Sequence, residues 1–187
     1  MANVGTSIRV ILLASIAVTL QIVVVSQLTV FGVSPDLLPL TIAAVGMLGG
    51  EMVGAVVGFI VGLLLDLALL QTLGVSSLVY LSTGYLAARF SELRKKQNAL
   101  LIMVVGGLAT AAATLSFIVI QFLLDIHVNF DIRMIRELLT TVLINTLLAI
   151  PVYFIVGKVL GEKLLANRRR LVALTQHSDQ ASALVKK

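Results

Sequence analysis

The residue of this sequence with the clearest capacity for chemistry is Asp66, a carboxylate placed well inside an apolar run. A charged side chain costs roughly 2.5–3.5 kcal/mol at the centre of a membrane helix, and such residues mark functional sites more often than chance allows. Asp66 is therefore expected to be either a polar anchor for a partner or an ion-linked site. The alternative is a carboxylate that reaches the membrane surface or is satisfied by a neighbouring helix.

A row of glycines leads up to this carboxylate. Glycine recurs at every fourth position, at Gly46, Gly50, Gly54, Gly58 and Gly62. Glycines four apart form a groove on one helix face, which lets a second backbone come very close. Because four residues turn a helix by slightly more than one revolution, Gly54, Gly58 and Gly62 form the compact part of the groove. The occupant is expected to be a helix of a partner protein or a helix of the same chain, with a narrow preference for the partner.

Other chemistry has little support in the sequence. His127 and His177 fall in different predicted compartments, and His127 with Asp125 and Asp131 is a weak cation site. There is no cysteine, no phosphate-binding glycine loop and no serine in a nucleophile motif. Glu51 is expected to be structural, since a negative charge is favoured at the start of a helix. The chain is predicted not to be an enzyme and to hold no metal or cofactor.

The composition shows which elements must position these residues. Apolar residues make up 59% of the chain and charged residues 12%, and the mean hydropathy is +1.08. These values predict an all-α integral membrane protein, well outside the range of soluble domains. The net charge of +5 flanks apolar segments, which indicates the anionic membrane face rather than nucleic acid.

Six apolar segments predict six transmembrane helices, at about 10–31, 37–48, 52–70, 75–88, 99–124 and 138–160. Together they form one membrane domain, 1–160, followed by a basic tail, 161–187. The segment 37–48 is short and could instead be re-entrant. Six spans place both termini on one side, together with 12 of the 14 Lys and Arg residues, whereas only Arg133 and Arg136 lie on the other. The positive-inside rule then predicts cytoplasmic termini and an outer loop at 125–137.

The basic tail carries a second candidate site. Lys163 and the run Arg168, Arg169 and Arg170 precede apolar residues at 171, 172 and 174. One interpretation is a short helix on the inner leaflet, held by about 1 kcal/mol per basic residue through attraction to anionic lipid. The alternative is a disordered flank of the last span.

Three consecutive stretches carry a resemblance to a known family. They are VSPDLLPL (33–40), the glycine-rich segment ending in GLLLDL (62–67) and LGVSSLVYLSTGYLAARF (73–90). In this order and spacing they resemble the bacterial rod shape-determining protein family MreD. The resemblance covers roughly 34–90, and the length and the basic tail agree elsewhere.

The resemblance implies a function and a fold. Proteins similar to MreD are non-enzymatic partners of MreC, a bitopic protein with an extracytoplasmic domain. They help couple MreB filaments to peptidoglycan synthases of the inner membrane, and their fold is similar to six-helix substrate-binding subunits of energy-coupling-factor vitamin transporters. The positions that match the family or line the groove are expected to bind the partner: Gly54, Gly58, Gly62, Asp66, Pro35, Asp36, Tyr80, Gly84 and Tyr85. Gly74 also matches a recurrent family position.

An alternative of a different class is a small-molecule-binding subunit of a vitamin transporter. It would need a chamber lined by aromatic and polar groups. The chain has no Trp and three scattered Tyr, so helix docking is the better interpretation of the glycine groove.

Overall fold

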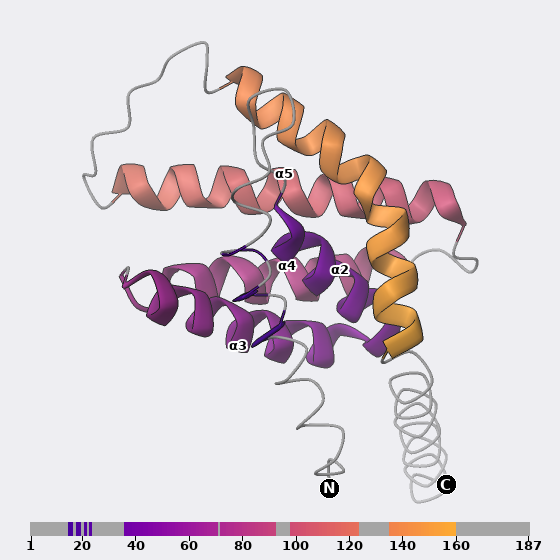
Figure 1. Ribbon diagram of the computed structural model, residues 1–187, viewed down its shortest axis with the longest axis horizontal. Coiled ribbons are helices and arrows are strands. Elements are labelled where there is room, and N and C mark those ends of the chain that lie inside the picture. Colours follow the sequence, from indigo (N-terminus) through magenta and orange to yellow (C-terminus); the bar gives the residue numbers. More distant parts are fainter. Residues whose placement is uncertain are drawn as a thin grey trace, which may run out of the picture.

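The computed structural model describes residues 15, 16, 18, 19, 21, 23, 36–70, 72–92, 98–123 and 135–159. All regular structure in this part of the chain is helical, as predicted. The helices are α2 (Leu37–Gly49), α3 (Glu51–Leu69), α4 (Val75–Glu92), α5 (Ala99–Leu123) and a last helix, Ile135–Val159 (Figure 1). Pro35, most of the predicted outer loop and the basic tail with Lys163 and Arg168–Arg170 lie outside the described residues.

Among the described residues, three helices are long and apolar enough to cross a membrane: Glu51–Leu69, Ala99–Ile120 and Ile135–Val159. The helix α2 is apolar but has only 13 residues, about 20 Å at 1.5 Å per residue. A crossing of roughly 30 Å needs about 20 residues. Six full crossings therefore remain a prediction.

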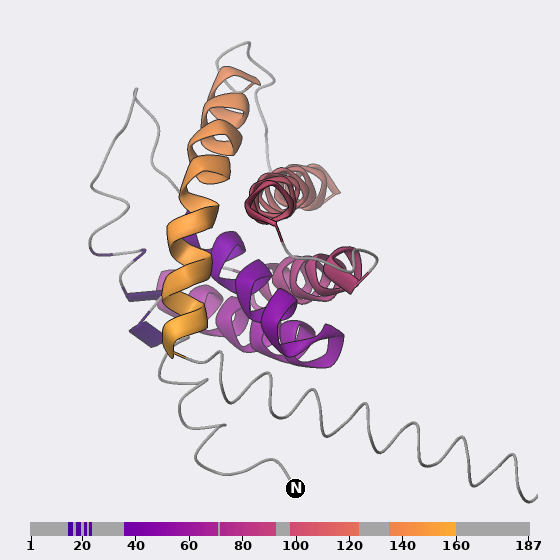
Figure 2. The same cartoon turned by 90° about the vertical axis from the view of Figure 1, so that its right-hand side faces the viewer.

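The bundle is built on an antiparallel pair, α3 and α4, that lie side by side (Figure 1). The Glu51–Arg89 ion pair joins one end of the pair, and hydrogen bonds donated to Asp66 by the backbone at the start of α4 join the other. Beside the pair, α5 runs in a similar direction, whereas Ile135–Val159 crosses α5 at a steep angle in both views (Figure 2).

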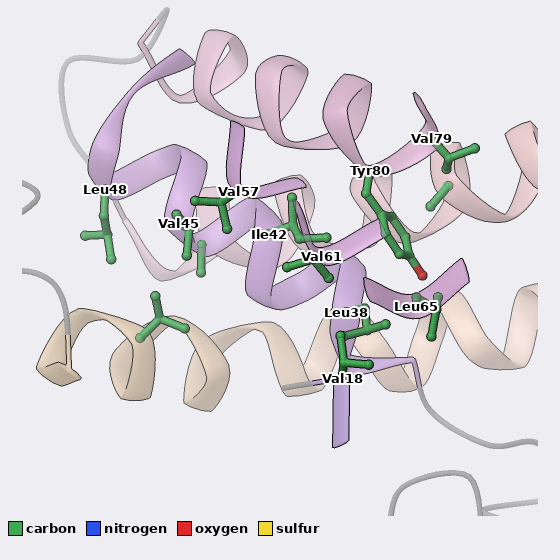
Figure 3. Packing of buried hydrophobic residues seen from close by; sticks show 13 residues of the cluster. Val18, Leu38, Ile42, Val45, Leu48, Val57, Val61, Leu65, Val79 and Tyr80 are labelled. Carbon is green, nitrogen blue, oxygen red and sulfur yellow. The ribbon is translucent and has the colours of Figure 1, made fainter. Parts of the chain in front are cut away.

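At the centre of the bundle lies α2, in which every residue from Leu38 to Gly49 is buried. Its apolar side chains pack against Val57, Val61 and Leu65 of α3 and against Val79 and Tyr80 of α4 (Figure 3). A helix that is apolar all round is buried all round. This packing explains why a segment too short to span can still be continuously hydrophobic.

The turn between α2 and α3 needs a glycine. Gly50 has φ +91°, a left-handed conformation that side-chain-bearing residues rarely adopt, and it caps both helices. Its N–H donates to the Gly46 carbonyl, 2.8 Å away, which ends α2 there. The predicted turn at Gly49 and Gly50 thus lies at Gly50.

Candidate functional site

The glycine groove of α3 faces the backbone of α4. A methyl group added at Gly54 would lie 2.5 Å from the Gly84 carbonyl oxygen, and one added at Gly58 would lie 2.5 Å from the Tyr80 carbonyl carbon. A methyl group at Gly62 would meet the backbone of Ser76. The three glycines therefore allow two backbones to touch, as a small-residue interface does in membranes.

The occupant of the groove is a helix of the same chain, so the preference for a partner helix is corrected. Gly84 and Tyr80 lie on the opposite side of this contact and are buried with it. A partner helix could reach Gly54, Gly58 or Gly62 only by displacing α4. The glycine period of four correctly predicted a close helix contact. Of the two helices that could occupy the groove, the structure has the one from the same chain, α4.

Asp66 also acts within the chain. Its side chain is fully buried and accepts hydrogen bonds from the backbone N–H groups of Gly74, at 2.8 Å, and Ser76, at 3.3 Å. These groups belong to the start of α4, where N–H groups have no partner inside the helix. The carboxylate caps this helix start, and the positive end of the helix dipole favours its charge. Of the alternatives drawn from the sequence, the geometry matches a carboxylate satisfied by a neighbouring helix.

A second polar cluster surrounds the start of α2. Asp36 N–H donates to Asn145 Oδ1 at 3.3 Å, Leu37 N–H donates to Gln21 Oε1 at 2.9 Å, and Leu38 N–H donates to Asp36 Oδ1 at 3.1 Å. Three consecutive N–H groups that α2 cannot satisfy thus find side-chain acceptors from three parts of the chain. Asp36, matched to the family from the sequence, is the N-cap of α2.

Asn145 is the residue of this cluster that the sequence interpretation missed as a site. Its Nδ2 donates to the Asp36 carbonyl at 2.7 Å and to Thr110 Oγ1 at 3.1 Å, and both Asn145 and Thr110 are fully buried. The available signal was an amide inside an apolar segment, which must find a partner in lipid. Its partner lies 109 residues away in sequence, and no local pattern indicates that distance.

A charged pair marks the opposite end of α3 and α4. Arg89 donates to Glu51 Oε1 at 3.0 Å, with 61% of the Arg89 side chain and 24% of the Glu51 side chain exposed. Both residues lie just outside the predicted spans 52–70 and 75–88. The hydrogen bond from Arg89 holds the pKa of the Glu51 carboxyl below its usual value, and the same bond raises the pKa of Arg89.

Two tyrosines named from the sequence have different surroundings. Tyr80 is 2% exposed, and its ring packs edge-on against Phe117, with centroids 5.7 Å apart. Tyr85 is 41% exposed, on the outward face of α4. Among the described residues expected to bind a partner, Tyr85 alone has an exposed side chain.

A cavity of about 10 Å³ between α2, α5 and the last helix is lined by Leu40, Met47 and Tyr153, among others. That is space for about one water molecule. In the described part of the chain, no group of three or more His, Cys, Asp or Glu side chains could hold a metal ion.

Comparison with known protein families identifies a family that covers most of the chain. The model of the rod shape-determining protein MreD family matches residues 1–163. The chain belongs to the MreD family. The resemblance drawn from residues 34–90 is thereby confirmed and extended over most of the chain.

Membership of the MreD family supports a role in determining rod shape. The family and the three long apolar helices also fit a membrane protein. No curated protein and no solved structure matches the chain, so the likeness to vitamin-transporter subunits remains a prediction.

Proposed function

We propose that this MreD-family chain is a non-enzymatic scaffold of the bacterial cell-elongation machinery. It binds MreC in the inner membrane and helps couple MreB filaments to peptidoglycan synthases. Both termini lie in the cytoplasm. The observation that carries the proposal is the family match over 1–163. The distribution of 12 basic residues on one predicted side and two on the other supports the orientation.

The packing of the described residues supports an outward-facing surface, rather than the glycine groove, as the partner contact. The glycine groove, Asp66, Tyr80 and Gly84 are all enclosed within the chain. The outward face of α4 instead carries Tyr85, which is 41% exposed, and Leu78, which is 63% exposed. Tyrosine is enriched at interfaces because it combines a large apolar ring with a polar end. We assign the MreC contact to this face.

The experiment is recovery of MreC with a tagged chain after crosslinking in native membranes. Recovery is normalised to the amount of each variant in the membrane. We expect the unmodified chain to recover MreC and Tyr85→Ala to recover less. Leu143→Ala is the matched control, because Leu143 is an exposed apolar residue on the last helix.

Two results would contradict the proposal. If the unmodified chain recovers no MreC, MreC is not its partner. If Tyr85→Ala recovers as much MreC as the unmodified chain, the outward face of α4 is not the MreC contact. Native mass spectrometry of the purified chain tests the transporter-subunit alternative, which requires a bound small molecule.

A further inference from the structure

The connection between α3 and α4 carries a group of exposed leucines. Leu67 and Leu69 lie in the last turn of α3, Leu70 is its C-cap, and Leu73 lies in the turn that leads to α4. Their exposed fractions are 52%, 43%, 92% and 60%, respectively. We call these four side chains the leucine tip, and Figure 1 shows the turn that carries them at the left-hand end of the α3–α4 pair. Large apolar side chains exposed together mark a surface that contacts protein or membrane.

The backbone of Leu70 supports a role for its side chain. Among the described residues, Leu70 is the only residue other than glycine with a positive φ, at +51°. Glycine usually supplies this left-handed conformation at the end of a helix, because a side chain strains it. The N–H of Leu70 donates to the carbonyl oxygens of Asp66 and Leu67, which hold it there. A strained residue of this kind supports a functional contact, and the 92% exposure of Leu70 means that the contact is not made within the chain.

The length of α3 determines how deep the leucine tip lies. At the other end of the helix, Glu51 pairs with Arg89, and the 61% exposure of the Arg89 side chain marks the aqueous boundary there. The 19 residues of α3 extend about 28 Å, whereas the hydrocarbon core is roughly 30 Å thick. An average helix tilt of about 20° shortens this reach further. The leucine tip therefore lies within the hydrocarbon or at its edge, and not in the water beyond it.

The charge distribution agrees with this depth. From 67 to 88 the sequence has no charged residue, although this stretch includes the end of α3, the turn and most of α4. The other predicted outer connection, 125–137, carries Asp125, Asp131, Arg133, Arg136 and Glu137. The backbone of the turn is also adapted to lipid, since the N–H groups of Gly74 and Ser76 donate to the buried Asp66. In lipid such groups have to be satisfied inside the protein.

We propose that the leucine tip is a lipid-contact surface, embedded among the acyl chains of the leaflet opposite the Glu51–Arg89 pair. In the predicted orientation this is the outer leaflet. The chain turns back inside the membrane there, with leucine side chains toward the acyl chains and Asp66 satisfying the polar groups of the turn. This inference does not rest on the proposed function, because it follows from the length of α3, the exposure of the leucines and the charge distribution.

The experiment measures whether the leucine tip meets lipid or water. The chain contains no cysteine, so a fluorescent bimane group can be attached to one introduced cysteine of the full chain. Leu70→Cys and Leu73→Cys place the label on the tip, and Leu73 reports it without the left-handed backbone of Leu70. The purified variants are reconstituted in vesicles of phosphatidylcholine and phosphatidylglycerol. One quencher is a lipid with a nitroxide on its acyl chain, and the other is iodide on both sides of the membrane.

Three matched positions calibrate the two quenchers. Leu108→Cys reports lipid contact, because Leu108 lies near the middle of α5 and is 53% exposed. Asn129→Cys lies in the predicted outer loop and reports water. Ala43→Cys reports the protein interior, because Ala43 is 2% exposed.

We expect the acyl-chain nitroxide to quench the label at Leu70 and Leu73 nearly as strongly as at Leu108. Iodide should quench these two positions at least about threefold less than Asn129, because an anion is excluded from hydrocarbon. Iodide quenching equal to that at Asn129, with little quenching by the nitroxide lipid, would overturn the proposal and make the tip a surface for an extracytoplasmic protein. Weak quenching by both, as at Ala43, would also overturn it, since a second copy of the chain would then cover the tip.

Discussion

The contact between α3 and α4 at Gly58 gives a quantitative prediction. A methyl group there would lie 2.5 Å from the carbonyl carbon of Tyr80 and 3.0 Å from the amide nitrogen of Leu81, and closer still to the Tyr80 oxygen. Non-bonded carbon atoms prefer about 3.5–4.0 Å. Gly58→Ala therefore requires α3 and α4 to separate by about 1 Å or more. The atoms that must move belong to the backbone, so no side-chain rotation can relieve the contact.

The magnitude follows from two opposing effects. Overpacking costs about 1–3 kcal/mol, toward the upper end where backbone must move. Replacing an interior helical glycine by alanine returns roughly 1 kcal/mol through helix propensity. We expect Gly58→Ala to lower the free energy of unfolding by up to about 2 kcal/mol. Gly58→Leu should be much worse, because its larger side chain must also enter the contact.

Gly157→Ala is the matched control, since the nearest atom to an added methyl group there is Leu48 Cδ1 at 3.9 Å. That variant should be neutral, or stabilised by up to about 1 kcal/mol. The assay is the midpoint of thermal unfolding of each purified variant in one detergent. If Gly58→Ala and Gly157→Ala unfold at the same temperature, α4 does not occupy the glycine groove and the reasoning fails.

Four further predictions concern the polar groups. Asp66→Asn should destabilise the chain less than Asp66→Leu in the same unfolding assay, because Asn keeps one acceptor for the N–H of Gly74 or Ser76. Leu leaves both N–H groups unsatisfied, at about 1–3 kcal/mol each. Equal destabilisation by the two variants would mean that the charge of Asp66 itself matters. Asn145→Leu should be strongly destabilising and Leu143→Ala mild, since only Asn145 is buried and hydrogen-bonded. Because Arg89 lowers the pKa of Glu51, the ion pair stabilises the fold at pH values above the ordinary glutamate pKa, and this stabilisation is lost as the pH falls through the lowered pKa. The small difference in unfolding temperature between the unmodified chain and Glu51→Gln should therefore vanish in acid. A peptide of the basic tail should bind anionic liposomes at low salt, and replacing Arg168, Arg169 and Arg170 by Gln should weaken that binding; unchanged binding would exclude lipid contact.

The sequence predicted the kind of contact at the glycines but not the neighbour. A period of four shows that one face of α3 is flat, and this is a property of that helix alone. The neighbour depends on the complementary surface, which α4 supplies with Gly84 and with the backbone of Ser76 and Tyr80. In α4 these positions follow no regular glycine period. For this reason the sequence left both occupants open.

The start of α2 illustrates a different limit of sequence interpretation. Length and hydrophobicity identified the segment 37–48 and its ambiguity between a span and a re-entrant segment. They could not indicate that the amide of Asn145 and the hydroxyl of Thr110 meet Asp36, because those groups come together only in the folded bundle. Each was visible as a polar residue in an apolar run. Their common position follows from how the helices cross.

Asp36 and Asp66 have the same structural role, so substitutions at these residues can distinguish an effect on folding from an effect on partner binding. Each carboxylate accepts hydrogen bonds from backbone N–H groups at the start of a helix, α2 in one case and α4 in the other. Substitutions at either acid, or at Gly58, should therefore lower the amount of folded chain without lowering MreC recovered per folded chain. Tyr85→Ala should do the reverse, because Tyr85 is exposed and its removal leaves no buried group unsatisfied. Recovery per folded chain that falls with Gly58→Ala but not with Tyr85→Ala would return the MreC contact to the glycine groove.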